Sequence, residues 1–137
     1  MRYSFLLVLF IVMCIVQCNA KQPDFEISKS GWAKVDIVIN QNATSSEKTA
    51  ARELCSYLAT ITGADFVVSA PGSVGKDAPR ILVGQSEEAR RLVGLRNWKE
   101  LGTDGILIEF VGNDLVIAGD RPRGTLYAVY TFLEDYI

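Results

Sequence analysis

Histidine is absent from the sequence. A histidine base activates the serine and cysteine nucleophiles of hydrolase triads, and histidine is also a common zinc ligand. Its absence therefore excludes Ser-His-Asp and Cys-His catalysis and most zinc sites. Cysteine is scarce as well: Cys14 and Cys18 lie near an apolar N-terminal run, and Cys55 is the third. Without that N-terminal part a single thiol remains, so no intramolecular disulfide can form and an exported domain must depend on its core.

A large excess of charge is also missing. The chain has 14 Lys and Arg against 16 Asp and Glu, a formal net charge of −2. Residues 1–20 contain one charged side chain, Arg2, so the remaining 117 residues (137 − 20) have 13 basic and 16 acidic side chains, or −3. Binding to nucleic acid requires a basic patch, and this mild, mixed balance predicts none. The remaining length fits one domain of ordinary size.

No apolar run is long enough for a comfortable membrane span, which takes about 20 residues. The apolar residues 5–16 follow the positively charged Met1-Arg2 and precede a cleavage zone that ends at Ala20. This pattern predicts a signal peptide over residues 1–20. Acylation of Cys18, as in a bacterial lipoprotein, remains an almost equal alternative, although Gln17 departs from the Gly, Ala or Ser that is usual before such a cysteine. Either way we expect an exported protein: secreted, periplasmic, or held at the cell envelope, with a membrane reached only through a lipid anchor.

Two helices are indicated by their start signals. Thr44 and Glu47 have the spacing of a capping box, and Gly63 stands where the left-handed end of that helix belongs. Ser86 is an N-cap residue followed by two glutamates, which suits the start of a second, shorter helix. Residues 21–33 predict an approach segment before the fold.

The strand signals complete the order of elements. Strands are predicted at residues 34–40, 65–69, 80–84, 104–111 and 114–119. The last two are joined by a Gly-Asn turn, which predicts a hairpin, and the apolar third strand is typical of a sheet covered on both faces. A last helix follows, with Leu126, Val129, Tyr130 and Leu133 predicted on its buried face.

These elements predict the fold class. The order is β-α-β-β-α-β-β-α, which gives a mixed sheet of about five strands with two to three packed helices. The class is α+β (α/β-like), and the domain occupies residues 34–137.

No residue is marked out for catalysis. Cys55 falls on the apolar face of the first helix without a histidine to activate it, so we expect a structural thiol. Asp104 and Asp120 are typical of turns, and Glu134 and Asp135 of a solvated helix face, whereas acid–base glycoside chemistry needs two carboxyl groups that flank a substrate. We therefore expect no catalytic residue, no cofactor and no metal ion.

The turn before the last helix is the one candidate site. Asp120, Arg121, Arg123 and Gly124 precede a helix N-terminus, where backbone donors favour an anion such as a carboxylate. The alternative, which we rank first, is a turn whose arginines pair with acidic groups across a contact between domains. A separate motif, Asn42-Ala-Thr, matches a glycosylation acceptor, although such triplets are common by chance.

The ordered set of motifs resembles a known domain family. Its most specific part is Arg-Gly-Thr-Leu-Tyr, followed by Phe-Leu-Glu, in residues 123–134. It is accompanied, in order, by Val35 to Ile39, Ala50 to Leu58 with Ile61-Thr-Gly63, Ile81 to Gly84, Asp104-Gly-Ile-Leu-Ile and Leu115 to Gly119. This set resembles the N-terminal domain that precedes the catalytic barrel in alpha-glucuronidases and, more distantly, the domain before the barrel in beta-hexosaminidases.

The resemblance implies a function for the domain. It implies a non-catalytic accessory domain of an exported glycoside hydrolase that acts on polysaccharide, for example by removing uronic acid side groups from xylan. The partner would be a downstream catalytic barrel of the same protein, and we expect the chain to be truncated before it. The resemblance carries no catalytic residue onto this chain and does not identify the sugar.

A stand-alone carbohydrate-binding module is the alternative. Such a module needs exposed aromatic side chains for stacking on sugar rings. Trp32 and Trp98 fall in irregular segments and could serve, whereas Tyr57, Tyr127 and Tyr130 fall on helices and are expected to be packed.

Overall fold

The computed structural model describes residues 24–75 and 77–137. The expected signal peptide, the possible lipidation site Cys18 and the first residues of the approach segment lie outside the described residues. The rest of that segment contains an antiparallel hairpin of β1 (Ser28–Lys29) and β2 (Trp32–Ala33). Ser30 and Gly31 form its turn with φ of 51° and 78°. The sequence did not predict this hairpin.

A five-stranded mixed sheet forms the centre of the fold. Its strands are β3 (Asp36–Ile39), β4 (Val68–Ser69), β5 (Arg80–Val83), β6 (Ile106–Val111) and β7 (Asp114–Gly119). They lie in the order β4-β3-β5-β7-β6, and all neighbours are parallel except β6 and β7. The α+β class, the mixed five-stranded sheet and the predicted order of its elements are confirmed.

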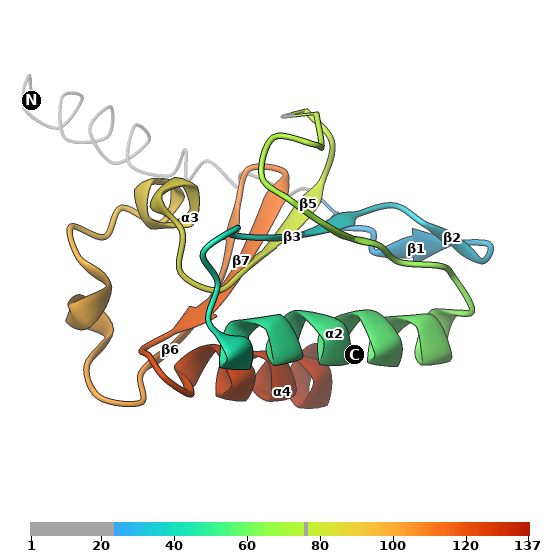
Figure 1. Ribbon diagram of the computed structural model, residues 1–137. Coiled ribbons are helices and arrows are strands. Elements are labelled where there is room, and N and C mark those ends of the chain that lie inside the picture. The colour runs from blue at the N-terminus through green and yellow to red at the C-terminus, as the bar shows by residue number, and fades with distance from the viewer. Residues whose placement is uncertain (1–23, 76) are drawn as a thin grey trace, which may run out of the picture.

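Helices cover both faces of this sheet. The helices α2 (Ser45–Thr62) and α4 (Gly124–Tyr136) lie side by side on one face, as Figure 1 shows. The short helix α3 (Glu87–Leu92) and the 3-10 helix η1 (Trp98–Leu101) lie on the opposite face. The segment between α3 and β6 therefore contains one short 3-10 turn.

The strands alternate their side chains between two apolar clusters. The larger cluster, under α2 and α4, contains Ile37, Ile81 and Ile117. The smaller one, under α3, contains Leu82 and Val116. Because both faces are covered, the central strands are apolar after their charged first residues, as parallel strands generally are.

The first helix begins and ends as predicted. The Thr44 hydroxyl accepts a hydrogen bond from the Glu47 amide (3.2 Å), and the Glu47 carboxylate accepts one from the Thr44 amide (2.7 Å). Gly63 ends the helix in the left-handed conformation with φ of 70°. Its buried face includes Leu54 and Leu58, whereas Ile61 in the last turn is exposed.

The predicted buried face of α4 is found except at one position. Val129 is buried, and Leu126 and Leu133 are partly buried against the larger cluster, whereas Tyr130 is 38% exposed. Ala128 and Phe132 are buried in addition. Tyr130 was misplaced because apolar residues occur nearly all round this helix, so periodicity alone could not fix the limits of the buried face. Within the described residues, none of the helices combines the length and apolar character needed to cross a membrane.

Candidate functional site

The predicted arginine turn lies at the carboxyl-terminal edge of the sheet. Since β3, β5 and β7 are parallel, the residues that follow them meet at one edge, and α2, α3 and α4 all begin there. In open α/β sheets, this edge is where functional groups from different strands converge. The candidate site can therefore be described from the three connections that leave these strands.

The carboxylate of Glu47 joins the three connections. Glu47 lies in the first turn of α2, and its side chain is 1% exposed. Its carboxylate accepts a hydrogen bond from the backbone amide of Gln85 (3.0 Å), a residue that follows β5. It also accepts hydrogen bonds from Nε (3.2 Å) and Nη2 (3.1 Å) of Arg121, a residue that follows β7. With the bond from the Thr44 amide, one buried carboxylate receives four donors.

The environment of Glu47 lowers its pKa. Burial alone would raise the pKa of this carboxyl group, but the hydrogen bonds from the Gln85 amide, the Arg121 guanidinium and the Thr44 amide outweigh it. The carboxylate is therefore held in its charged form, which is the form that pairs with an arginine.

Glycine at position 84 makes room for this carboxylate. A Cβ at Gly84 would lie 3.0 Å from Cγ and Cδ of Glu47, and the φ of +85° also favours glycine. The neighbouring connections are tied by amide side chains: Gln85 Nε2 donates to the carbonyl of Gly119 (3.0 Å), and Asn40 Nδ2 donates to the carbonyl of Gln85 (3.3 Å). The edge is thus held by side chains from all three connections.

The arginines of the turn pair with acidic groups of the same domain. Arg121 binds Glu47 through two nitrogens and remains 42% exposed. Arg123 Nη2 lies 3.4 Å from both carboxylate oxygens of Asp104, and its guanidinium carbon lies 5.7 Å from the centroid of the Tyr127 ring. These partners were not predicted. Anion binding and a contact with another domain stay predictions.

The backbone of the turn is packed unusually closely. The amide of Asp120 donates to the carbonyl of Gly105 (2.8 Å), and the amide of Gly124 donates to the carbonyl of Asp120 (2.7 Å). A Cβ at Gly119 would lie 2.2 Å from the carbonyl carbon of Gly124, and one at Gly124 would lie 2.8 Å from the carbonyl oxygen of Gly105. Both glycines therefore allow α4 to begin directly against the end of β7.

This close approach gives a stability prediction. Gly119→Ala is expected to lower the free energy of unfolding by about 3 kcal/mol, the upper end of the usual cost of overpacking. Urea unfolding followed by circular dichroism would measure it. Gly75→Ala is the matched control, because a Cβ at Gly75 has open space around it; it should change stability by no more than about 0.5 kcal/mol. Equal effects of the two substitutions would contradict the proposed close packing.

The other candidate groups are dispersed. Asp104 lies beside Arg123, whereas Glu134 and Asp135 are exposed on α4. The thiol of Cys55 donates to the carbonyl of Phe66 (3.2 Å), and burial raises its pKa, which makes it a poor nucleophile. In the part of the chain that the structure describes, no three His, Cys, Asp or Glu side chains gather in a way that could hold a metal ion.

Asn42, the possible glycosylation site, is exposed in the turn between β3 and α2. The backbone amide of Asn42 donates a hydrogen bond to the side-chain oxygen of Asn40 (3.3 Å). The threonine of the acceptor triplet, Thr44, is the N-cap of α2. Glycosylation at this position stays a prediction.

The aromatic side chains are placed differently from the sequence interpretation. Trp32 is 73% exposed on the β1–β2 hairpin, but Trp98 packs against the apolar cluster under α3. The two tryptophans therefore belong to different parts of the surface. Tyr57, Tyr127 and Tyr130, which were expected to be packed, are exposed on α2 and α4. The expectation failed because the presence of a tyrosine on an amphipathic helix does not indicate whether its side chain lies on the buried face or on the exposed face.

A buried ion pair at the opposite edge of the sheet was missed. Arg80, the first residue of β5, donates from Nε (2.9 Å) and Nη2 (2.6 Å) to the two carboxylate oxygens of Asp114, and from Nη1 to Glu88 (2.9 Å). The hydrogen bonds to Asp114 raise the pKa of Arg80. The available signal was an arginine at the start of an otherwise apolar central strand, since a buried charge requires a partner.

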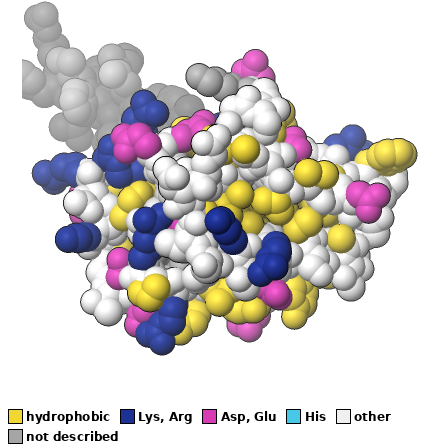
Figure 2. Space-filling view, in the orientation of Figure 1, with side chains coloured by type: hydrophobic (Ala, Val, Ile, Leu, Met, Phe, Trp, Pro, Cys, Tyr) yellow, Lys and Arg dark blue, Asp and Glu magenta, His cyan; other side chains and the backbone are white. Residues whose placement is uncertain are grey.

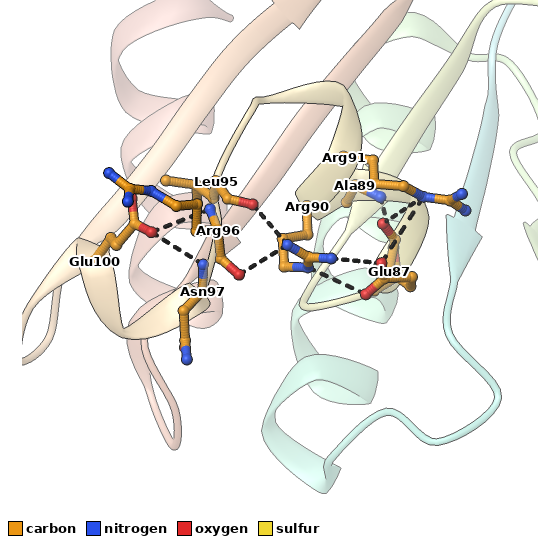
Figure 3. A network of polar contacts seen from close by, with 9 residues as sticks. Glu87, Ala89, Arg90, Arg91, Leu95, Arg96, Asn97 and Glu100 are labelled. Carbon is orange, nitrogen blue, oxygen red and sulfur yellow. Dashed lines mark hydrogen bonds and ion pairs between the residues drawn. The ribbon is translucent and has the colours of Figure 1, made fainter.

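A second polar network holds the segment that follows α3. Figure 3 shows Arg90 between the Glu87 carboxylate and the carbonyl oxygens of Leu95 and Arg96, each 2.8 Å from Nη1. The hydrogen bond from Arg90 lowers the pKa of Glu87. Glu100 accepts from the amides of Arg96 (3.0 Å) and Asn97. These contacts fix α3 relative to η1.

Comparison with known proteins identifies the domain type. Residues 26–132 match the family described as the N-terminus of glycosyl hydrolase family 67. No curated protein matches the sequence. The family match covers most of the chain, including all five strands of the central sheet and the arginine turn. The chain therefore belongs to the family of N-terminal domains of glycosyl hydrolase family 67.

Proposed function

We propose that this domain is the non-catalytic accessory domain of an exported, alpha-glucuronidase-like glycoside hydrolase and packs against its catalytic barrel. The observation that carries the proposal is the family match over residues 26–132, because this domain type is part of a larger glycoside hydrolase with a catalytic domain. The substrate of the whole enzyme would be a polysaccharide of the xylan type. Export is supported by the signal-peptide pattern of residues 1–20, with Cys18 as a possible lipid attachment site.

The exposed aromatic side chains of α2 and α4 support a contact surface on this pair of helices. Tyr57 on α2 and Tyr127, Tyr130 and Tyr136 on α4 are exposed. Tyrosine is enriched in protein interfaces because it combines a large apolar ring with a hydroxyl group. The arginine turn lies at the N-terminal end of α4, so its Arg123 borders the same surface beside Tyr127. We propose that the barrel docks on this surface, which we call the tyrosine face.

The tyrosine face can be tested with the separately produced catalytic barrel of the same enzyme. The double substitution Tyr127→Ser/Tyr130→Ser should weaken binding to the barrel by at least tenfold, or about 1.4 kcal/mol, because two aromatic contacts are lost. Isothermal titration calorimetry would measure it. Both side chains are exposed, so the fold should be retained.

Trp32→Ser is the matched control for this experiment. Among the described residues, Trp32 is the most exposed large hydrophobic residue, and it lies on the β1–β2 hairpin outside the tyrosine face. Binding to the barrel should be unchanged in this variant. If Trp32→Ser weakens binding and the double tyrosine variant does not, the contact surface is wrongly placed. If the unchanged domain does not bind the barrel, the accessory role itself is contradicted.

A further inference from the structure

A cavity lies at the carboxyl ends of β3 and β5, on the α3 side of the sheet. Its volume is about 270 Å³, and Val38 and Leu82 form its apolar floor. Polar side chains from two connections surround it: Asn40 follows β3, and Ser86, Glu87 and Arg91 belong to the start of α3 or to the helix itself. The tyrosine face is on the other side of the sheet, so this cavity is separate from the proposed domain contact.

The cavity lies where the connections from two neighbouring parallel strands leave the sheet on opposite faces. The helix that follows β3 is α2, which packs on one face of the sheet, whereas the helix that follows the neighbouring β5 is α3, which packs on the other. The two connections therefore diverge and leave a crevice between the strand ends. In open α/β sheets, ligands bind in the crevice at such a switch point. The cavity is at the position where this rule places a ligand.

The rim of the cavity offers both donors and acceptors. The Ser86 hydroxyl accepts from the amide of Ala89 (3.0 Å), so its own hydrogen can be donated elsewhere. Arg91 is 71% exposed and donates from Nε to the Glu87 carbonyl (3.4 Å), which leaves its terminal amino groups for a ligand. The Glu87 carboxylate is exposed and can accept, and Figure 3 shows it beside Arg91 on α3.

These groups favour one class of ligand. A phosphate or carboxylate is disfavoured because Glu87 and Glu88 both line the cavity. A nucleotide is disfavoured further because the turn after β3 lacks a glycine-rich loop. Hydroxyl groups both donate and accept, and they match a rim that contains an amide, a hydroxyl, a carboxylate and a guanidinium group.

We propose that this cavity binds a small neutral polyol of the size of one sugar ring. Its volume of about 270 Å³ lies just below the range of about 300–1,000 Å³ typical of ligand pockets, which favours a single ring over a chain. The carbon side of the ring would lie on Val38 and Leu82, and its hydroxyl groups would meet Ser86, Glu87 and Arg91. This site differs from the flat aromatic platform of a conventional carbohydrate-binding module, because its floor is formed by aliphatic side chains.

Methyl-resolved NMR titration of the full chain tests this site with three probes: xylose, glucose and glucuronate. We expect saturable shifts of the Val38 and Leu82 methyl groups in the millimolar range for xylose or glucose, and weaker binding of glucuronate because of its charge. Arg91→Ala should weaken binding about tenfold through the loss of one charge-assisted hydrogen bond. Arg52→Ala is the matched control, because Arg52 is an exposed arginine on α2 outside this cavity.

Several results would overturn the proposal. The first is the absence of saturable shifts at ~100 mM of either neutral sugar, a concentration that fills even a very weak site. Tighter binding of glucuronate than of xylose, or an equal loss of affinity in Arg91→Ala and Arg52→Ala, would also overturn it. Shifts confined to the Trp32 indole N–H, followed in an amide spectrum of the same samples, would place binding at the β1–β2 hairpin instead and overturn the proposal. None of these results depends on the barrel, so this proposal can fail without the accessory role failing.

Discussion

Glu47→Ala is expected to lower the free energy of unfolding by about 3–4 kcal/mol. The substitution removes the acceptor of four hydrogen bonds from Thr44, Gln85 and Arg121. The two partly buried backbone amides lose their acceptor, and the Arg121 guanidinium loses its counter-ion. Urea unfolding at neutral pH would measure the change.

Glu53→Ala is the matched control, since Glu53 is a half-buried glutamate of the same helix for which no hydrogen bond is found among the described residues. It should cost no more than about 0.5 kcal/mol. A similar loss in both variants would mean that Glu47 contributes only through its helix propensity. It would contradict the inference that its carboxylate holds the three connections together.

The lowered pKa of Glu47 also predicts how its contribution depends on pH. A carboxyl group with a depressed pKa in the fold contributes stability that is present above its pKa in the unfolded chain, about 4.3. This contribution is lost as the pH falls through the lower pKa of the folded state. Glu47→Gln should therefore show a flatter loss of stability in acid than the unchanged protein. Parallel curves for the two proteins below that pH would contradict the lowered pKa.

Asp114→Ala is expected to cost about 3 kcal/mol, because it leaves a buried arginine without its main partner. The Arg80 side chain is 7% exposed and binds both oxygens of Asp114. Glu88 remains within 2.9 Å of Arg80, so part of the charge stays compensated and the cost should lie at the lower end of the range for broken buried pairs. Thermal and urea unfolding would measure the loss.

The double variant Arg80→Met/Asp114→Leu provides the control. Replacing a buried pair by apolar side chains of similar size is often neutral or stabilising, so the double variant should recover most of the lost stability. Glu88 would lose its partner, but it is partly exposed and can be hydrated. A double variant as unstable as Asp114→Ala would show that the strands at this edge require the ion pair itself.

Much of this fold could be predicted because its signals are local. The capping box of Thr44 and Glu47, the glycine end at Gly63 and the Gly-Asn hairpin each act over a few residues, and all three are found as predicted. Local signals cannot select among several apolar faces. For this reason Tyr130 was expected on the buried face of α4, and Tyr57 and Tyr127 were expected to be packed, although all three are exposed.

The candidate site was only partly predictable for the same reason. The turn at Arg121 and Arg123 was recognised from its position before a helix, but the partner of Arg121 lies 74 residues away and that of Arg80 lies 34 residues away. Only the parallel pairing of the strands brings such residues together. The glutamate of a capping box also gives no sign that its carboxylate has further partners, because the motif is complete without them.

The several partners of Glu47 restrict which substitutions evolution can accept. A capping box alone would admit glutamine at position 47, but Arg121 requires a negative charge there, and a residue with a Cβ at position 84 would displace the carboxylate. Among relatives, an acidic residue at the position of Glu47 should therefore accompany a basic residue at that of Arg121 and glycine at that of Gly84. The three positions should vary together, although they lie on three different connections of the sheet.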